Sequence, residues 1–209
     1  MATIAAPSRR EARRHNRRAA IIAVAQRSFL EHGYAGTTMS AIACALGGSK
    51  GTLWSYFPSK EVLFAAVLED ATEAFRRQVS LILNPQDDLA DALERFCREF
   101  LTMLASPDAI ALYRLVVGEA NRFPEVGEIF FARGPRRVQE LLGRYLGAAM
   151  ERGALRREMP IRAARHLIGL CVYSLHQQLL MGAVHEAEPV RIETEARLAT
   201  ATFLRAYAP

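Results

Sequence analysis

The stretch Thr37–Lys60, TTMSAIACALGGSKGTLWSYFPSK, constrains the fold of the chain more than any other. A short helix with one apolar side is predicted from Met39, and Gly47-Gly48 then ends it because glycine readily adopts positive φ. Ser49 is placed to cap a second helix that begins at Lys50 and carries hydrogen-bond donors and aromatic rings. Two short helices joined by a glycine turn are typical of the helix-turn-helix, whose second helix lies in the DNA major groove.

The charge of the chain is concentrated near its N-terminus. Residues 1–60 hold nine basic residues against two acidic ones, a net charge of +7, whereas the remainder carries −2. The positive excess therefore lies in the segment that has the helix-turn-helix pattern. Such an asymmetry favours a polyanion-binding N-terminal end.

Paired arginines precede the first apolar helix face. Their spacing of four would align them in a stripe on a helix, and they are Arg9, Arg10, Arg13, Arg14, Arg17 and Arg18. Two interpretations stay open for residues 1–18. They form a solvated, partly disordered extension, or a basic arm that follows phosphates or enters the minor groove. In the second case we expect Arg14, Arg17 and Arg18 to contact DNA.

Helical periodicity continues through the rest of the chain, without strand alternation or an internal repeat. A helix capped by Ser59 runs for some twenty residues, so that it begins in one domain and ends in the next. Later helices end or begin at proline signals, and Gly134-Pro135 is placed to kink or split one of them. We predict an all-α fold of about nine helices. Residues 19–60 form a three-helix helix-turn-helix domain, and residues 61–209 form a helical bundle for effector binding and dimerisation.

Several classes of protein are disfavoured. No apolar run has the length of a membrane helix and no secretory signal is recognisable, so we expect a cytoplasmic protein without membrane contact. Cys44, Cys97 and Cys171 have no metal-ligand spacing, and we interpret them as buried thiols. No nucleophile, carboxylate pair or phosphate loop indicates an enzyme, a metal site or a cofactor. A nucleic-acid binder without sequence preference remains a rival to a specific regulator.

The run from Ile21 to Phe64 resembles the tetracycline-repressor (TetR) family of transcription regulators. Two positions depart from the family pattern: Trp54 replaces the usual Tyr, and Gly48 replaces the usual Val. The stretch ALYRLVVGEANRFPEVGEIFFARG resembles the AefR-type branch of the ligand domain. The matching positions are Ala25, Phe29, Gly33, Tyr34, Thr38, Ile42, Ala43, Gly47, Ser49-Lys50-Gly51-Thr52-Leu53, Phe57 and Ser59-Lys60-Glu61.

The resemblance implies a DNA contact set. Thr38, Tyr56 and Lys60 would contact phosphates, and the groove would be faced by Ser49, Lys50, Thr52 and Trp54. Trp54 and Tyr56 could instead belong to the domain core. We favour the surface for both aromatic rings, because Leu53 and Phe57 already supply a buried face at a spacing of four.

The resemblance also implies an effector and a partner subunit. Aromatic, Met and polar residues of the middle helices would together line an apolar pocket. Each of them taken alone is more typical of a core position. The residues are Phe75, Phe96, Phe100, Met103, Tyr113, Val117, Phe130, Tyr145, Tyr173, His176 and Gln177. The small apolar faces of the last two helices would form a homodimer interface, or would pack only within the chain. These are Ala163, Leu167, Leu170, Ser174, Ile192, Ala196, Ala199 and Phe203.

These expectations combine into one mechanism. A small apolar or aromatic effector would displace the middle helices, and the helix that begins at Lys60 would transmit the shift to the DNA-binding domain of each subunit. The spacing of the two DNA-binding domains would then no longer match the operator, and the repressor would be released.

Overall fold

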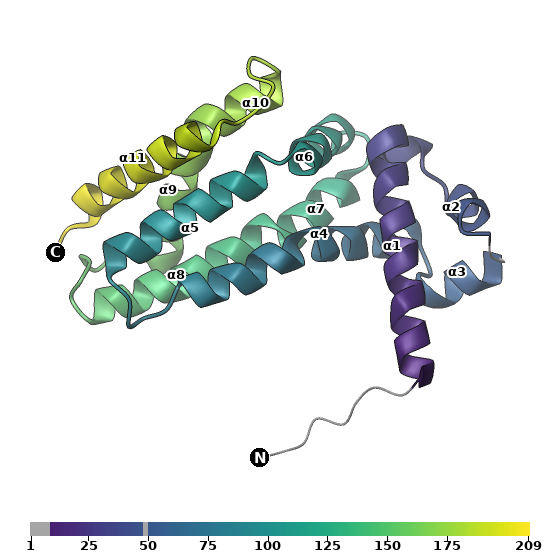
Figure 1. Ribbon diagram of the computed structural model, residues 1–209, viewed down its shortest axis with the longest axis horizontal. Helices are drawn as coiled ribbons and strands as arrows, with labels where there is room; N and C mark the ends of the chain where they lie inside the picture. The colour runs from purple at the N-terminus through teal and green to yellow at the C-terminus, as the bar shows by residue number, and fades with distance from the viewer. Residues whose placement is uncertain (1–8, 48–49) are drawn as a thin grey trace.

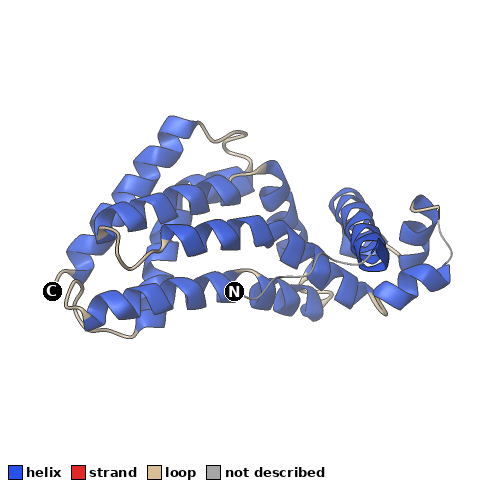
Figure 2. Ribbon diagram, turned by 60° about the horizontal axis from the view of Figure 1, so that its bottom comes forward, coloured by secondary structure: helices blue, strands red, loops and turns tan. Residues whose placement is uncertain are grey.

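The computed structural model describes residues 9–47 and 50–209, and all regular structure within these ranges is helical (Figures 1 and 2). The predicted all-α fold is therefore confirmed. In the described ranges there are nine helices if α7 and α8 are taken as one split helix and α9, η1 and α10 as one continuous helix. The elements are α1 (Arg9–Gly36), α2 (Met39–Ala45), α3 (Lys50–Tyr56), α4 (Lys60–Ile82), α5 (Leu89–Leu104), α6 (Pro107–Glu119), α7 (Pro124–Arg133), α8 (Pro135–Glu151), α9 (Pro160–Cys171), the π-helical turn η1 (Val172–His176), α10 (Gln177–Met181) and α11 (Pro189–Tyr207).

Hydroxyl caps fix the starts of the helices around the recognition motif. The Thr38 hydroxyl accepts a hydrogen bond from the Ala41 amide at 3.1 Å, and α2 begins at the next residue. The Ser59 hydroxyl accepts one from the Val62 amide at 3.3 Å, which starts α4. Each cap satisfies a backbone donor that has no partner within its helix.

The first helix is longer than the sequence pattern indicates. The arginine segment from Arg9 is continuous with the rest of α1, and no break separates it from the helix-turn-helix domain at Ala19. Gly33 interrupts the helix near its other end, with φ 73° and ψ 176°. Gly33 is not in the left-handed helical conformation, because its ψ is extended although its φ is positive.

Helix α4 links two apolar cores. Its first half contributes Leu63 and Phe64 to the core of α1–α3, and its second half contributes Phe75 and Val79 to the core of the C-terminal bundle. The N-terminal core also includes side chains from α6 and α7. In Figure 1, α1 crosses the end of the bundle next to α4, α6 and α7. The two domains therefore share a packed junction.

The C-terminal bundle is built from antiparallel neighbours. Helix α11 packs along α5, and α8 packs along α9. Gly134 splits α7 from α8, as its pairing with Pro135 predicted. Within the described ranges, no helix alone has both the length and the apolar composition to cross a membrane. Helices α5 and α6 have that length and composition only when they are taken together, and the pair is bent by 69°.

Candidate nucleic-acid interface and ligand cavity

Helix α3 presents a polar and aromatic outer face. Leu53 is buried beneath it, whereas Lys50 is exposed and the Trp54 side chain is 38% exposed. Thr52 and Tyr56 are half-buried. This arrangement agrees with the preference for a surface position of Trp54. Ser49, predicted to face the groove, lies outside the described residues.

The N-terminal arginines of α1 lie beside α3. The Arg14 guanidinium lies 6.0 Å from the centre of the Tyr56 ring, and the Arg18 guanidinium lies 5.4 Å from that of Phe57. Arg14 and Arg18 are exposed, and Arg17 is half-buried. Cation–π contacts of this kind hold exposed guanidinium groups near aromatic faces. The structure thus brings the arginine segment close to the end of α3, the helix that is predicted to face the major groove.

The predicted phosphate contacts differ in their surroundings. Thr38 is exposed, and its hydroxyl caps α2 while keeping a proton to donate. Lys60, in contrast, is half-buried, and its Nζ donates to the Tyr34 carbonyl at 2.9 Å. The same ammonium lies 4.1 Å from the Tyr34 ring centre and 5.8 Å from that of Phe123. The ammonium of Lys60 thus lies in the junction between the domains, and its predicted phosphate contact stays a prediction.

Tyr34 organises this junction. Its ring is buried and packs against Phe29, Phe64 and Phe123, with ring centres 5.3–5.8 Å away. Its hydroxyl donates to Glu61 at 3.3 Å. Burial, followed by the nearby carboxylates, raises the pKa of Tyr34, so the phenol stays protonated. Hydrogen bonding, first from Ser59, lowers the pKa of Glu61.

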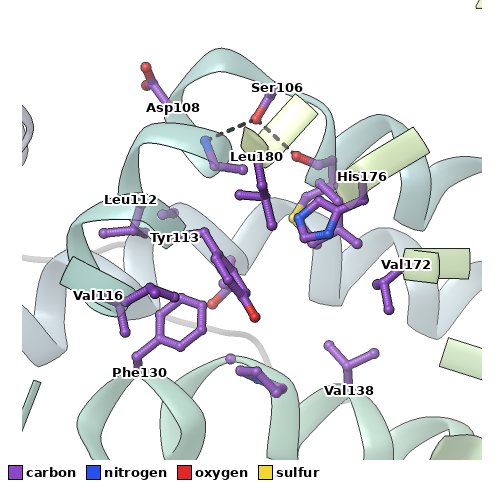
Figure 3. Close-up of a pocket in the computed structure, with 18 of the residues that line it drawn as sticks. Ser106, Asp108, Leu112, Tyr113, Val116, Phe130, Val138, Val172, His176 and Leu180 are labelled. Carbon is purple, nitrogen blue, oxygen red and sulfur yellow. Dashed lines mark hydrogen bonds between the residues drawn. The ribbon is translucent and has the colours of Figure 1, made fainter. Parts of the chain in front are cut away.

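A cavity of about 830 Å³ lies between the two cores. Its volume is within the range of roughly 300–1,000 Å³ that is usual for small-molecule sites. Figure 3 shows side chains from α6, α7, α8 and η1 around it. Eight of the eleven predicted pocket residues line it: Phe75, Phe100, Met103, Tyr113, Val117, Phe130, His176 and Gln177.

Three predicted pocket residues lie elsewhere. Phe96 is fully buried and stacks on the far side of Phe100, with ring centres 5.7 Å apart. Tyr145 belongs to the core of the bundle, where its hydroxyl has no hydrogen-bond partner among the described residues. Tyr173 is 71% exposed. The π-helical turn changes the direction of successive side chains, so that Tyr173 points outward while His176 faces the cavity.

The cavity also reaches the DNA-binding domain, a contact that was not predicted from the sequence. Gln26, Phe29 and Leu30 of α1 form part of its lining. Their spacing places them on one helix face, but no local pattern indicates that the bundle packs there. The Gln26 side-chain amide donates to the Asp108 carboxylate at 3.2 Å, which joins α1 to the start of α6 at the edge of the cavity.

Two polar rings meet in the cavity. Tyr113 and His176 are in edge-to-face contact, with ring centres 5.4 Å apart, and Tyr113 also contacts Phe130 at 5.7 Å (Figure 3). His176 is only 5% exposed, and burial lowers its pKa. The imidazole is therefore neutral at pH 7 and offers one donor and one acceptor.

The predicted dimer residues face the interior of their own chain. All but two are buried: Ala163, Leu167, Ile192, Ala196, Ala199 and Phe203 lie in the core of the bundle. Leu170 packs against that core, and the Ser174 hydroxyl donates to Glu195 of α11 at 2.8 Å. This assignment is corrected, because small apolar faces here mediate the close packing of α9 and α11 on the bundle.

Two of the three cysteines form a buried pair. A hydrogen bond with Cys97 and burial raise the pKa of the Cys171 thiol, so it stays protonated. Cys97 also accepts a hydrogen bond from the Thr200 hydroxyl, at 3.5 Å. Cys44 is exposed, contrary to the expectation of three buried thiols. No cluster of His, Cys, Asp and Glu in the described parts of the chain has the geometry of a metal site.

Comparison with known proteins gives a family for both parts of the chain. Residues 21–67 match the family described as bacterial regulatory proteins, tetR family, and residues 91–209 match the AefR-like transcriptional repressor, C-terminal domain. The HTH-type transcriptional regulator RutR of Escherichia coli K12 is 31% identical over 140 residues, 65% of this chain and 58% of RutR. The match thus spans under two thirds of that curated relative.

Solved structures match over a greater length. The flavonoid-responsive regulator FrrA has a TM-score of 0.78 and 30% identity, covering 93% of this chain and 98% of FrrA. A TetR-family regulator from Mesorhizobium loti has a TM-score of 0.80 over the same shares, and its 24% identity supports the fold alone. Because the C-terminal family model covers more than half of the sequence, the chain belongs to the TetR family of transcriptional regulators, with an AefR-like C-terminal domain.

Proposed function

We propose that the protein is a homodimeric repressor that a small apolar or aromatic effector releases from its operator. The observation that carries this proposal is the cavity, because one continuous space is lined both by the C-terminal bundle and by α1 of the DNA-binding domain. A ligand in that space contacts both domains at once. The solved relative FrrA is named for its response to flavonoids, which are aromatic.

DNA binding is assigned to α3 and the N-terminal half of α1. Lys50 and Trp54 are exposed on α3 and are proposed to face the major groove, with Thr52 beside them. Arg14 and Arg18 lie next to the end of that helix, where they supply charge for the adjacent phosphates. Phosphate contacts position such a module, and side chains that reach the base edges give it specificity.

Helix α6 is proposed to transmit the effector signal. One side of it lines the cavity, and both ends are tied to α1: Asp108 accepts from Gln26, and Glu119 accepts from the Ala35 amide at 3.1 Å. Its middle is tied to α10, because Arg114 donates to the carbonyls of residues 179 and 180. Displacement of α6 by a ligand would therefore move α1 directly.

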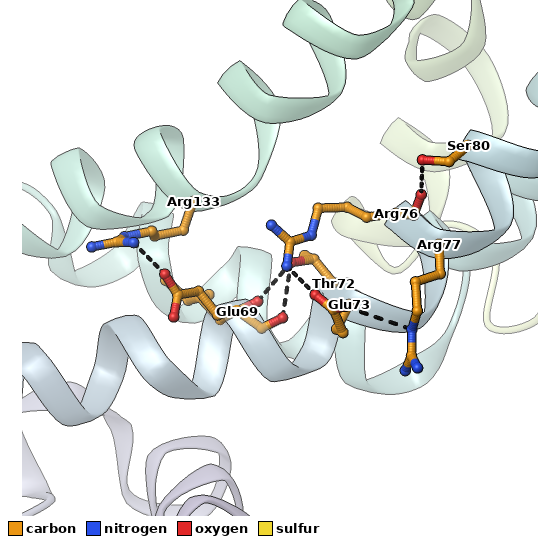
Figure 4. Close-up of polar contacts among 8 residues, drawn as sticks. Glu69, Thr72, Glu73, Arg76, Arg77, Ser80 and Arg133 are labelled. Atoms are coloured by element: carbon orange, nitrogen blue, oxygen red, sulfur yellow. Dashed lines mark hydrogen bonds and ion pairs between the residues drawn. The ribbon is translucent and has the colours of Figure 1, made fainter. Parts of the chain in front are cut away.

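Helix α4 provides a second route to the DNA-binding domain. Glu69 of α4 pairs with Arg133 of α7, and Glu73 pairs with Arg76 and Arg77 along α4 itself (Figure 4). The first pair joins α4 to a helix that lines the cavity. A shift of α7 would thus reach α4, as the sequence-based mechanism requires.

The homodimer is proposed to use the outer faces of α9, η1 and α11. Gly169 is exposed on α9 and Tyr173 on η1, and Leu198 and Thr202 are exposed on α11. These residues replace the inward-facing set named from the sequence. Tyr173→Asp combined with Leu198→Asp should shift sedimentation toward the monomer, whereas Leu81→Asp, at an 81% exposed position on α4, should not. An unchanged dimer in the double variant would refute this surface.

The function is tested with labelled DNA from upstream of the gene and with a scrambled duplex of equal length. We expect roughly 10³-fold tighter binding to the native duplex. Lys50→Ala should weaken binding to the native duplex more than to the scrambled one. Arg14→Ala should weaken binding to both duplexes, and the slope of log K against log salt concentration should fall by about one. Arg157→Ala, which removes the same charge from an exposed position in the C-terminal domain, should leave both affinities unchanged.

Equal affinity for the two duplexes would instead support the rival function, a nucleic-acid binder without sequence preference. That outcome would contradict the repressor proposal even if every basic residue contributed to affinity.

A further inference from the structure

The lining of the cavity suits a flat, apolar ligand. Phe75, Phe100, Phe130 and Tyr113 contribute rings from four different helices. Aromatic pairs gain most from edge-to-face or offset contacts. Around the cavity, Tyr113 and Phe130 meet edge-to-face, and the ring planes of Phe75 and Phe100 are tilted by 38°. A planar aromatic framework therefore finds contacts on several sides.

Two neighbouring polar groups in this lining have no hydrogen-bond partner among the described residues. They are the Tyr113 hydroxyl and the ring nitrogens of the buried His176, whose side chains touch each other edge-to-face. Figure 3 shows both side chains on the cavity side of their helices. Neither group is completely enclosed by protein, so a ligand that covers them must supply hydrogen bonds in place of water, and a ligand that does so is favoured over one that cannot. A neutral imidazole and a phenol together match a group that both donates and accepts, such as a hydroxyl.

The cavity offers no cation to a charged ligand. None of the described residues that line it is Lys or Arg, and its one ionised side chain, Asp108, is negative. Two arginines nearby are engaged elsewhere: Arg114 with backbone carbonyls and Arg133 with Glu69. The guanidinium of Arg136 lies 5.5 Å from the ring centre of Phe131, whose side chain is 43% exposed. Burial of an anion among apolar groups without a countercharge is strongly unfavourable.

We propose that the cavity selects an uncharged aromatic compound and binds its hydroxyl group jointly through Tyr113 and His176. This inference rests on the proposed function only in taking the cavity as the effector site. The aromatic framework of the ligand packs among the phenylalanine rings, and its hydroxyl donates to the imidazole and accepts from the tyrosine, or the reverse. Carboxylic acids of the same shape are rejected because no residue of the lining balances their charge.

Three compounds that share one framework test the inference: 4-hydroxybiphenyl, biphenyl and biphenyl-4-carboxylate. Calorimetric titration of the full-length protein without DNA should rank the phenol first. We expect it to bind roughly fivefold more tightly than biphenyl, the gain from one or two neutral hydrogen bonds. The carboxylate should bind at least tenfold more weakly than the phenol.

Variants assign the preference to the two residues. Tyr113→Phe and His176→Phe should each reduce the advantage of the phenol over biphenyl toward one, and His176→Gln, which keeps a donor and an acceptor, should retain most of it. His185→Phe makes the same chemical change as His176→Phe at an exposed position and should change nothing. A circular dichroism spectrum like that of the wild type establishes that each variant is folded.

Three results would overturn the inference. These are a carboxylate that binds as tightly as the phenol, a phenol preference that survives both phenylalanine variants, and a failure of all three compounds to bind. If the carboxylate binds and Arg136→Gln abolishes its binding, the anion is held by Arg136, which also contradicts the proposal. Release of operator DNA by the same compounds is measured separately. A phenol that binds with this ranking but leaves DNA bound would contradict the proposed function and not this inference.

Discussion

Replacing Gly33 with Ala tests how the two domains are joined. Gly33 has φ 73° and ψ 176°, a region that is essentially restricted to glycine and costs other residues about 1–3 kcal/mol. A Cβ atom at this position would also lie 2.8 Å from Glu119 Oε1, so the carboxylate must swing away. The hydrogen bond from the Ala35 amide to Glu119 is then lost. Because this bond is exposed, its loss adds only about 1 kcal/mol.

Together these effects predict that Gly33→Ala lowers the free energy of unfolding of the DNA-binding domain by roughly 2–4 kcal/mol. Urea unfolding followed by the fluorescence of Trp54, the only tryptophan of the sequence, reports on this domain. Gly47→Ala, in the same domain, is the matched control. That glycine also has a positive φ, of 60°, but an added Cβ would meet no atom within 4 Å, so we expect a loss of only about 1–2 kcal/mol.

A double-mutant cycle separates the contact from the backbone strain. In the background of Glu119→Ala, the Gly33→Ala change should cost about 1 kcal/mol less, because the carboxylate is no longer there to be displaced. A cost at Gly33 no greater than that at Gly47 would refute the role assigned to backbone strain. Simple additivity in the cycle would refute the role assigned to Glu119.

Three further predictions concern single side chains. Burial lowers the pKa of His176, so the unfolded chain binds the proton more readily than the folded chain does. The free energy of unfolding should therefore be highest above about pH 6.5 and should decrease as the pH falls from there through the folded pKa. In urea titrations at several pH values, His176→Phe should flatten this dependence. A maleimide should label Cys44 in the native protein and all three thiols after denaturation, as counted by mass spectrometry; native labelling of the buried pair would contradict the structure. Lys60→Met should destabilise the protein by about 1–2 kcal/mol through lost contacts with Tyr34, without changing the salt dependence of DNA binding. A slope of log K against log salt concentration that falls by about one would instead support the phosphate contact predicted for Lys60.

Much of the fold follows from patterns that act over a few residues. The hydroxyls of Thr38 and Ser59 precede apolar helical runs, and each cap forms where such a residue can satisfy a free backbone amide. Gly134-Pro135 splits a helix for an equally local reason. The outward position of Trp54 also follows locally, since Leu53 occupies the buried face of the same short helix.

The functional surfaces depend on which helix faces meet, and the sequence by itself leaves that open. The small apolar faces around Ala163 and Ala196 would suit a subunit interface or an internal core equally well, because the same close packing serves both. Only the tertiary structure places them inside. The direction of the long Lys60 side chain is likewise decided by the carbonyl and rings of Tyr34, which are distant in sequence.

The helical class and the helix-turn-helix follow from the sequence, because apolar periodicity and capping are local properties. The family resemblance indicated most of the aromatic residues that line the cavity. Only the tertiary structure decided that α1 lines the same cavity, through Gln26 and Leu30, and that Tyr113 and His176 meet in it. Such contacts join helices far apart in the chain, and they are set by the packing of whole elements rather than by any pattern within one of them.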